Sequence, residues 1–519
     1  MQVKCFANAP GQFNIHAFFP VVPHIGHLYS TVLADTLRRY YQLKGAEAYL
    51  CTGTDEHGLK IQQAAAKNNT EPIVFCNRVS ESFKKLCKAA NVDYTTFIRT
   101  TEERHAKAVH ALWGALEKAG YIYKGKHEGW YAVSDEAFYA SNQVQEIVDE
   151  AGNKIMVSIE SGQRVEWTEE ENYKFKLSAF GDRLLEWIEQ NPRAVVPLNR
   201  KNEVVSWIRS GLEDLSVSRL RSRLDWGIPV PGDNDHTIYV WLDALTNYLT
   251  AMGYPWREPN PVWPADVHVV GKDIVRFHAI YWPAFLMAAG LPLPKQILAH
   301  AHWTMGKQKM SKSKGNVADP FEVLEAYGVD PVRYYLVRDG GLADDGDYSE
   351  EMIKTRYKKD LAGQLGNLLN RSTAKSLNAS EIVPRLNPRL DPRDKVVHTK
   401  ITEAAAAFER AFENREFSRG FTVVFDMLSE ANKHFTENEP WNLVKEPSNK
   451  ARLDSVLFYA TEACRVAGIL LQPVMPSKMD LLLNRLGVPH DKRQLKHAKL
   501  WDGEERRLGE SAGVLFPKL

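Results

Sequence analysis

The sequence predicts a mixed α/β protein that ends in an all-helical region. Short apolar runs that stop at a glycine or a carboxylate alternate with helical patterns between residues 23 and 304, as in open parallel sheets. Short, alternating, aromatic-rich strands interrupt that pattern near residue 130, which predicts an inserted β-rich module. Beyond residue 327 the strand signals fade and apolar residues recur at helical spacing, which predicts a helical bundle.

The composition is that of an ordinary globular protein. A chain of 519 residues has room for about two to four domains. Lys and Arg number 66 against 65 for Asp and Glu, a net charge of +1, so any RNA-binding surface must be local. The five cysteines include no Cys-x-x-Cys pair, so neither a zinc knuckle nor a disulfide framework is predicted. No apolar run reaches the roughly 18 residues that span a bilayer.

A histidine pair precedes the first predicted helix. The run from Pro23 to His27 predicts a tight turn, and residues 28–45 carry apolar side chains at helical spacing. We expect His24 and His27 at the helix N-terminus, where N–H groups and the helix dipole favour anions. Gly26 would let the backbone approach a nucleotide closely. Two histidines three residues apart also occur as metal ligands or by chance.

A carboxylate follows the next predicted strand. Residues 48–53 form a short apolar run, and Asp55 comes directly after it. Ligands of open α/β sheets bind at the carboxyl ends of strands, so Asp55 is placed to hold a substrate ammonium group. The alternative is that Asp55 caps a helix that starts near Leu59. From there to residue 123 the pattern is helical.

The inserted module spans residues 129–177 and is rich in aromatic side chains. Stacking on RNA is one use for them, but packing of a small module is the favoured interpretation. The sheet is then expected to resume near Ile238, where a strand runs into a helix. That helix would place Trp241, Ala244 and Tyr248 on one wall of a site.

Two further segments carry candidate ligand-binding residues. Residues 267–271 read as a strand with Gly271 and Asp273 at its end, a combination that suits contact with a ribose and an adenine. His278, on the next helix, is a candidate site residue or a hydrogen-bonded core histidine.

A lysine-rich loop follows. Lys309 and Lys312 lie in a glycine-bounded polar run between residues 306 and 316, which predicts a mobile cationic loop. Lysine is suited to phosphate oxygens whose charge moves during a reaction. Taken alone, such a loop is more often a solvated basic surface.

The helical region contains a candidate RNA-binding set. Asn367 and Arg371 are four residues apart and share a helix face, and Trp441 directly follows a helix break. Single-stranded RNA is recognised by stacking on aromatic rings and by hydrogen bonds to splayed bases. Without the upstream motifs, Trp441 would be assigned to packing and Arg371 to a surface charge.

Together these motifs resemble those of the methionyl-tRNA synthetase family, which belongs to the class I aminoacyl-tRNA synthetases. They occur in family order from Pro23 to Trp441. The resemblance implies a Rossmann-type parallel-sheet catalytic domain with an inserted β-rich connective module, followed by an all-α anticodon-binding bundle. The expected divisions are residues 1–123 and 236–300 for the two catalytic halves, 124–235 for the connective insertion and return, 301–365 for the lysine loop and connecting region, and 366–519 for the anticodon-binding domain.

The resemblance implies an ATP-dependent, two-step ligation of L-methionine to tRNA(Met) through methionyl-adenylate, with Mg²⁺ accompanying ATP. Positioning and electrostatics would dominate such a reaction. By resemblance, the catalytic residues are His24, His27, Lys309 and Lys312, and ATP binding adds Gly26, Gly271 and Asp273. Methionine would be bound by Asp55, Trp241, Ala244, Tyr248 and His278, with the Tyr248 hydroxyl as a sensor of the thioether. The CAU anticodon would be read by Asn367, Arg371 and Trp441.

The first twenty residues depart from the family pattern. They show no clean strand period, and His16 and Pro20 replace an aliphatic residue and an asparagine in a strand central to the family's sheet. We hypothesise that this segment is a misassigned or alternative start, which would also explain why no transit peptide is recognisable. Mapping the N-terminus of the native protein tests this, and an intact Met1-Gln2-Val3 would refute it.

The inserted module lacks the zinc-binding cysteines of many family members. Because mitochondrial and some bacterial forms share that pattern, we expect a zinc-free monomer without membrane attachment, located in the mitochondrial matrix or, alternatively, the cytoplasm. Stoichiometric zinc would refute the zinc-free assignment. An alternative function is a catalytically impaired synthetase-like tRNA-binding protein, although such a protein needs no triphosphate clamp. A class I synthetase for another amino acid is disfavoured by Trp241, Tyr248 and the anticodon set.

Overall fold

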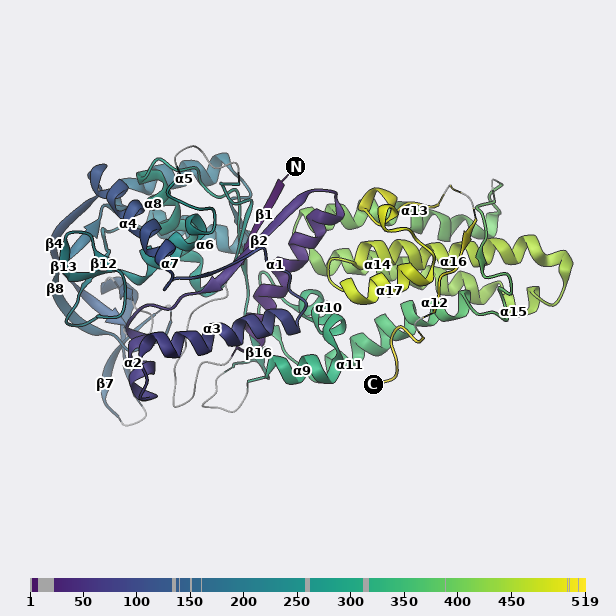
Figure 1. Cartoon of the computed structure of the whole chain (residues 1–519), viewed down its shortest axis with the longest axis horizontal. Helices are drawn as coiled ribbons and strands as arrows, with labels where there is room; N and C mark the ends of the chain where they lie inside the picture. The colour runs from purple at the N-terminus through teal and green to yellow at the C-terminus, as the bar shows by residue number, and fades with distance from the viewer. Residues whose placement is uncertain are drawn as a thin grey trace.

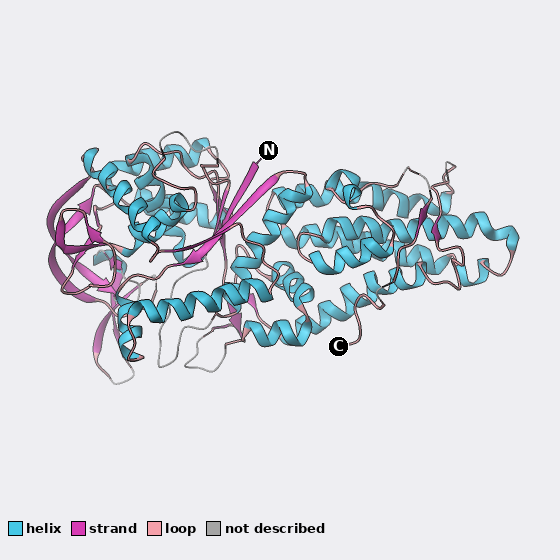
Figure 2. Cartoon of the chain, in the orientation of Figure 1, coloured by secondary structure: helices cyan, strands magenta, loops and turns pink. Residues whose placement is uncertain are grey.

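The chain forms an elongated molecule with an α/β part at one end and a helical bundle at the other (Figure 1). The computed structural model describes residues 2–7, 23–132, 137–139, 141–149, 152–159, 161–256, 262–310, 317–387, 389–501, 503, 505–511 and 513–519. Strands gather in the α/β part, whereas the second part is almost entirely helical (Figure 2). The fold class predicted from the sequence is therefore confirmed.

The α/β part is built on a six-stranded sheet in which every neighbouring pair is parallel. In spatial order its strands are β3 (Thr96–Arg99), β2 (Glu47–Thr54), β1 (Gln2–Ala7), β14 (Val267–Gly271), β15 (Ile297–His300) and β9 (Val195–Val196). Strand β1 lies at the centre, with Cys5 opposite both Leu50 and Val267. The sequence pattern missed this strand. Asn14 to Pro20, including His16 and Pro20, lies outside the described residues.

Helix α1 (Ile25–Leu43) packs against β1, β2 and β14. Sixteen of its residues are buried, on more than one face, because the sheet lies on one side and later helices lie on the other. The helix ends where Gly45 adopts a positive φ of 84°, a conformation that glycine adopts at little cost. Helices α2 (Leu59–Lys67), α3 (Pro72–Ala89) and α4 (Glu103–Lys118) follow. Strand β3 lies within the stretch that the sequence predicted as helical.

The inserted module is β-rich, as predicted. Its main sheet has the order β10-β8-β4-β5, with β10 (Leu215–Ser216), β8 (Glu166–Phe175), β4 (Ile122–Ala132) and β5 (Ala137–Tyr139). Strands β6 (Val144–Val148) and β7 (Lys154–Ser158) form a separate hairpin. Helices α5 (Gly181–Gln190) and α6 (Leu198–Arg209) lead back towards the sheet.

The strand that ends at Ile238 is not part of the parallel sheet, contrary to the sequence prediction. It is β13 (Asp233–Ile238), which pairs antiparallel with β11 (Ser218–Leu220) and β12 (Pro229–Val230). Helix α7 (Val240–Thr250) begins directly afterwards. An apolar strand pattern does not specify which sheet the strand joins, because the apolar face can be buried against any sheet that lies beside it.

The connecting region begins with β16 (Trp303–Met305), which pairs with β17 (Gln308–Lys309) and with β18 (Gly346–Asp347). Helices α9 (Pro320–Tyr327), α10 (Val329–Asp339) and α11 (Glu350–Arg356) follow. Helix α11 continues through a π-helical segment, η6 (Tyr357–Gly366), into α12 (Asn367–Ser372). One continuous helical segment therefore leads from the connecting region into the bundle.

The bundle contains long helices with apolar faces, as the sequence predicted. They are α13 (Lys395–Glu413), α14 (Phe417–Glu437), α16 (Lys450–Leu471) and α17 (Pro476–Arg485), with the short α15 (Pro440–Leu443) between α14 and α16. A small pair, β19 (Ile382–Val383) with β20 (Arg506–Arg507), ties the C-terminal segment to this part. Among the described residues, no helix combines the length and apolarity needed to cross a membrane.

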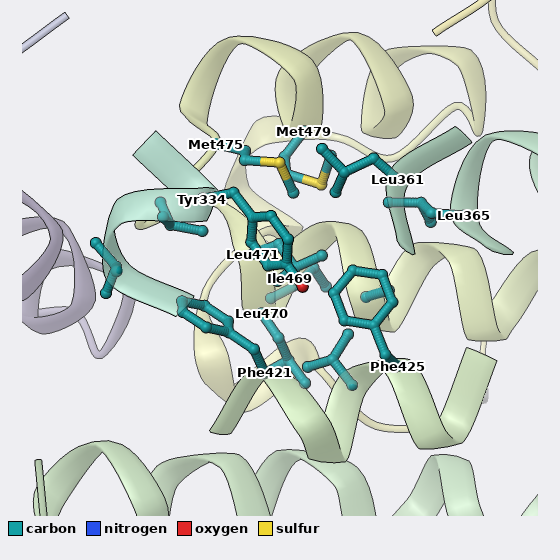
Figure 3. Close-up of a cluster of buried hydrophobic side chains, with 14 of the residues drawn as sticks. Tyr334, Leu361, Leu365, Phe421, Phe425, Ile469, Leu470, Leu471, Met475 and Met479 are labelled. Carbon is teal, nitrogen blue, oxygen red and sulfur yellow. The ribbon is translucent and has the colours of Figure 1, made fainter. Parts of the chain in front are cut away.

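A single apolar core runs from α1 into the bundle. Tyr334 of α10 inserts between the bundle helices, with ring centroids 5.4 Å from Phe421 and 5.5 Å from Phe425 (Figure 3). Met475 and Met479 cover it from the opposite side (Figure 3). Because the core is continuous, the two parts of the molecule are packed together rather than joined by a linker.

Candidate active site

The histidine pair lies at the N-terminus of α1, as predicted. His24 is the N-cap: its Nδ1 accepts a hydrogen bond from the Gly26 N–H at 3.1 Å, and its own N–H donates to His27 Nδ1 at 3.1 Å. The two rings stack with centroids 3.7 Å apart. A Cβ at Gly26 would lie 3.0 Å from the His24 ring, so glycine makes room for that ring. The pair is thus preorganised at a helix end that favours anions.

Asp55 lies in the loop after β2 and does not cap a helix. The N-cap of α2 is Gly58, which makes no side-chain cap, so the capping alternative is wrong. The neighbouring Glu56 is buried and accepts hydrogen bonds from Thr54, Thr101 and Arg99 at 2.6 to 2.9 Å. Its carbonyl also accepts from the Trp226 Nε1–H at 2.6 Å. These bonds fix the loop that presents the Asp55 carboxylate.

The four residues predicted to form an amino-acid pocket come from α7 and the helical segment after β14. Trp241 stacks on Phe277 at 3.7 Å with an interplanar angle of 6°, and Tyr248 lies 2.7 Å from His278 Nε2. Ala244 is buried on the same face of α7. Phe277 was not among the predicted residues, although it directly precedes His278 in the sequence.

The proton of the Tyr248 hydroxyl can be placed. His278 Nδ1 lies 2.9 Å from the Ile274 carbonyl, so Nδ1 is the donor. Burial lowers the pKa of His278 to about 4, so the ring is neutral and its Nε2 accepts from Tyr248. In this arrangement the hydroxyl presents lone pairs, not its proton, to a ligand.

The turn after β14 holds a second carboxylate. A Cβ at Gly271 would lie 2.5 Å from Asp273 Oδ1, so glycine leaves space for this side chain. Asp273 Oδ1 lies 3.0 Å from His302 Nε2. Burial alone would raise the pKa of Asp273, but the hydrogen bond and charge interaction with His302, a backbone hydrogen bond and the nearby His300 together outweigh it, and the pKa falls to about 2. The site therefore contains an ionised acceptor at a strand end.

Sequence reasoning missed His300 and His302. His300 Nε2 lies 2.7 Å from Ser30 Oγ, which links β15 to α1, and His302 contacts Asp273. His300 ends β15 and His302 follows it by two residues; ligands of parallel sheets bind at the carboxyl ends of strands, so this position was a usable signal.

The lysine loop is described only in part. The backbone of Lys309 is in β17, opposite Thr304 of β16. Lys312 lies in 311–316, outside the described residues, and the Lys309 side chain is likewise undescribed. The roles expected for both lysines therefore stay predictions.

The predicted RNA-binding residues come together in the bundle. The Arg371 guanidinium lies 4.7 Å from the Phe435 ring and 5.8 Å from the Trp441 ring. Trp441 is 41% exposed and Asn367 is exposed on the same helix as Arg371. Helix α15, which carries Trp441, lies towards the end of the bundle farthest from the parallel sheet (Figure 1).

Within the part of the chain that the structure describes, no cluster of three or more His, Cys, Asp or Glu side chains has the spacing to hold a metal ion. Cys51, Cys76 and Cys87 are buried thiols, and burial raises the pKa of each to about 12. These thiols are therefore neutral and poor metal ligands as they stand.

The comparisons with known proteins agree with one another. The family model described as tRNA synthetases class I (M) matches residues 17–373. A mitochondrial methionine–tRNA ligase from Homo sapiens is 45% identical over 96% of this chain and 88% of its own length. A mitochondrial methionine–tRNA ligase from Xenopus laevis is 43% identical over 100% of this chain and 94% of its own length. A crystal structure of Mycobacterium tuberculosis methionyl-tRNA synthetase bound by methionyl-adenylate has a TM-score of 0.91 and 37% identity, covering 100% of both chains.

Proposed function

This chain belongs to the class I tRNA synthetases of the methionyl type, and on that premise we propose how its residues carry out the reaction. The enzyme is an ATP-dependent methionine–tRNA ligase. The methionine carboxylate attacks the α-phosphate of ATP, pyrophosphate leaves, and methionyl-adenylate forms. The 3′-terminal ribose of tRNA(Met) then takes the methionyl group and AMP leaves.

The observation that carries this assignment is the convergence of three elements at one sheet edge. The His24–His27 pair begins α1, Asp55 follows β2, and Gly271 and Asp273 follow β14. Strands β2 and β14 flank β1 in a parallel sheet, so their carboxyl ends face the same side. A nucleotide and an amino acid bound there would lie next to each other, which is what an in-line displacement requires.

Each group has a chemical task in this arrangement. The α1 N-terminus and its histidines stabilise phosphate oxygens, because oriented N–H donors need no rearrangement during the reaction. The ionised Asp273 accepts hydrogen bonds from the adenosine. Asp55 pairs with the substrate ammonium, and its loop is held by the Glu56 network. Lys309 and Lys312 would close over the β- and γ-phosphates of the Mg²⁺–ATP substrate.

The pocket wall of α7 selects the side chain. Trp241, Ala244 and Tyr248 form an apolar surface, and His278 fixes the Tyr248 hydroxyl. The Tyr248 hydroxyl donates its hydrogen bond to His278. The Tyr248 side chain therefore contacts the thioether through its ring edge and its oxygen lone pairs rather than through the hydroxyl proton. Sulfur is polarisable and packs well against aromatic edges, so an aromatic wall favours methionine over branched aliphatic residues.

The bundle reads the anticodon in this proposal. Trp441 and Arg371 offer a stacking platform with a cation nearby, and Asn367 offers an amide for base edges. The domain division follows: residues 1–123 and 236–300 activate methionine, 124–235 form the connective insertion, 301–365 carry the lysine loop and connecting region, and 366–519 bind the anticodon.

We further propose that the protein acts in mitochondria as a zinc-free monomer. The mitochondrial names of its relatives support the location. The absence of a Cys-x-x-Cys pair anywhere in the sequence supports the zinc-free assignment. Subcellular fractionation, elemental analysis and sedimentation test the three statements separately.

Methionine-dependent exchange of pyrophosphate into ATP is the direct test of the activity. We expect exchange with L-methionine and at most background with leucine, isoleucine or glutamine. Charging of tRNA(Met) then tests the second step, with a tRNA bearing a changed anticodon as the control. Exchange that depends on another amino acid, or no exchange by a folded enzyme, would contradict the proposal.

A further inference from the structure

Asp243 is a fully buried carboxylate held by two histidines from different elements. His57 Nδ1, in the loop after β2, lies 2.7 Å from Asp243 Oδ2. His105 Nε2, on α4, lies 2.7 Å from Asp243 Oδ1. The second nitrogen of His105 lies 2.9 Å from Thr250 Oγ1 at the end of α7. Asp243, His105 and Thr250 are all at most 2% exposed.

This cluster lies on the face of α7 opposite the pocket. Asp243, Thr246 and Thr250 are spaced three and four residues apart, and so share one face of the helix. Trp241, Ala244 and Tyr248 have the same spacing, but are displaced by about half a turn at 3.6 residues per turn. One face of α7 therefore lines the proposed methionine pocket while the other is fixed to α4 and to the β2 loop.

The same cluster reaches the residue proposed to hold the ammonium group. His57 is two residues after Asp55, and Glu56, between them, is bonded to Arg99 of β3 at 2.8 Å. The loop is thus anchored to the edge of the sheet through Glu56 and to α7 through His57. The position of the Asp55 carboxylate relative to the pocket wall depends on both anchors.

The chemistry of the cluster makes it rigid. An ionised carboxylate only accepts hydrogen bonds, so each imidazole donates an N–H hydrogen bond to one oxygen of Asp243. Burial alone would raise the pKa of Asp243, but His57 and His105 outweigh it and the pKa falls to about 2. A buried charge that lost either partner would be costly, so the three side chains hold one geometry.

We propose that Asp243, with His57 and His105, is a positioning lock for methionine activation. It sets the separation between the Asp55 carboxylate and the Trp241–Tyr248 wall, and so determines how well methionine fits between them. This inference rests on the proposed function. It assigns the three residues an effect on methionine binding, and none on ATP, whose contacts lie at α1 and after β14.

The test compares His105→Leu, which removes the donor to Asp243, with His105→Gln, whose amide N–H can replace it. Asp243→Asn is the second test, since it removes the charge. Asp394→Asn is the matched control, because Asp394 accepts from His434 Nε2 at 2.7 Å in the bundle, away from the parallel sheet. Thermal unfolding of each variant shows which of them are folded, and pyrophosphate exchange measures KM for methionine and for ATP.

We expect His105→Leu and Asp243→Asn to raise KM for methionine about tenfold or more, the scale of a misplaced binding group. KM for ATP should change less than about twofold, and His105→Gln should recover most of the loss. Equal changes in the two KM values would contradict the proposed positioning role. So would a loss of stability with unchanged KM values, which is the result expected for Asp394→Asn. If the unmodified enzyme shows no methionine-dependent exchange, the proposed function fails, and the lock with it.

Discussion

Replacing Arg333 by methionine should destabilise the protein strongly, because this side chain joins the two parts of the molecule from a fully buried position. Arg333 of α10 is 0% exposed and donates to Asp35 Oδ2 on α1 at 2.6 Å. It also donates to four backbone carbonyls at 2.9 to 3.2 Å, those of Ala90, Asn91, Pro473 and Val474. These carbonyls belong to the segment after α3 and the segment after α16.

The size of the effect follows from what loses a partner. Asp35 would keep Arg39, whose Nε lies 2.7 Å away, and Arg38 at 3.3 Å, so its charge stays compensated. The four carbonyls would lose the guanidinium, at about 1 kcal/mol each. The free energy of unfolding should therefore fall by about 4 kcal/mol, a large share of the roughly 5–15 kcal/mol of a typical domain. Arg333→Lys should cost about half as much, since an ammonium group keeps the charge and three donors.

Urea unfolding measured by circular dichroism tests this prediction. The matched control is Arg356→Met, because Arg356 pairs with Asp339 at 2.6 Å but is 27% exposed. That variant should lose at most about 1 kcal/mol. If Arg333→Met is no less stable than Arg356→Met, the four carbonyl bonds do not contribute as the geometry indicates, and the reasoning is wrong.

Three further outcomes are expected. Tyr248→Phe should raise KM for methionine by about tenfold, because the buried His278 Nε2 loses its donor and the pocket wall loosens; an unchanged KM in pyrophosphate exchange would show that the hydroxyl has no part in binding. Burial lowers the pKa values of His278 and His300 to about 4, below the ordinary 6.5 or so. As the pH falls, the unfolded chain therefore protonates these two histidines at a higher pH than the folded chain does. Stability should be full above about pH 6.5 and fall as the pH drops towards 4, by roughly 3 kcal/mol per histidine, and His300→Asn should flatten that slope in acid unfolding. Arg371→Ala should lower tRNA charging by about tenfold or more and leave pyrophosphate exchange unchanged; equal losses in both assays would place Arg371 outside RNA recognition.

Several elements of the fold were readable because they depend on local patterns. The helix after His27 has apolar residues at helical spacing and a glycine at its end, and it forms as α1. The runs that became β2 and β14 are short, apolar and closed by glycine. The bundle helices carry apolar faces that need no knowledge of their partners. Such features are encoded within one or two turns of chain.

Other features were missed because their signals are not local. Strand β1 has the central place in the sheet, but the polar–apolar alternation in Gln2–Ala7 stops after four residues, at Phe6; its neighbours β2 and β14 supply the pairing. Strand β13 has a strand pattern, yet it joins an antiparallel sheet because β11 and β12 lie beside it. The helical stretch predicted after residue 59 concealed β3, whose four residues are too few to show a period.

By itself, the sequence determined the fold class, the order of the motifs and the identity of the residues that could carry the chemistry. Only the tertiary structure decided what these residues do to one another. It showed that the Tyr248 hydroxyl donates a hydrogen bond to His278 Nε2, fixed Asp55 from both sides through Glu56 and His57, and joined Asp243 to His105 across 138 residues of chain. Hydrogen bonds and pKa values depend on distances of a few ångströms between side chains that are remote in sequence. Those distances are set by how helices and strands pack, and no local pattern encodes them.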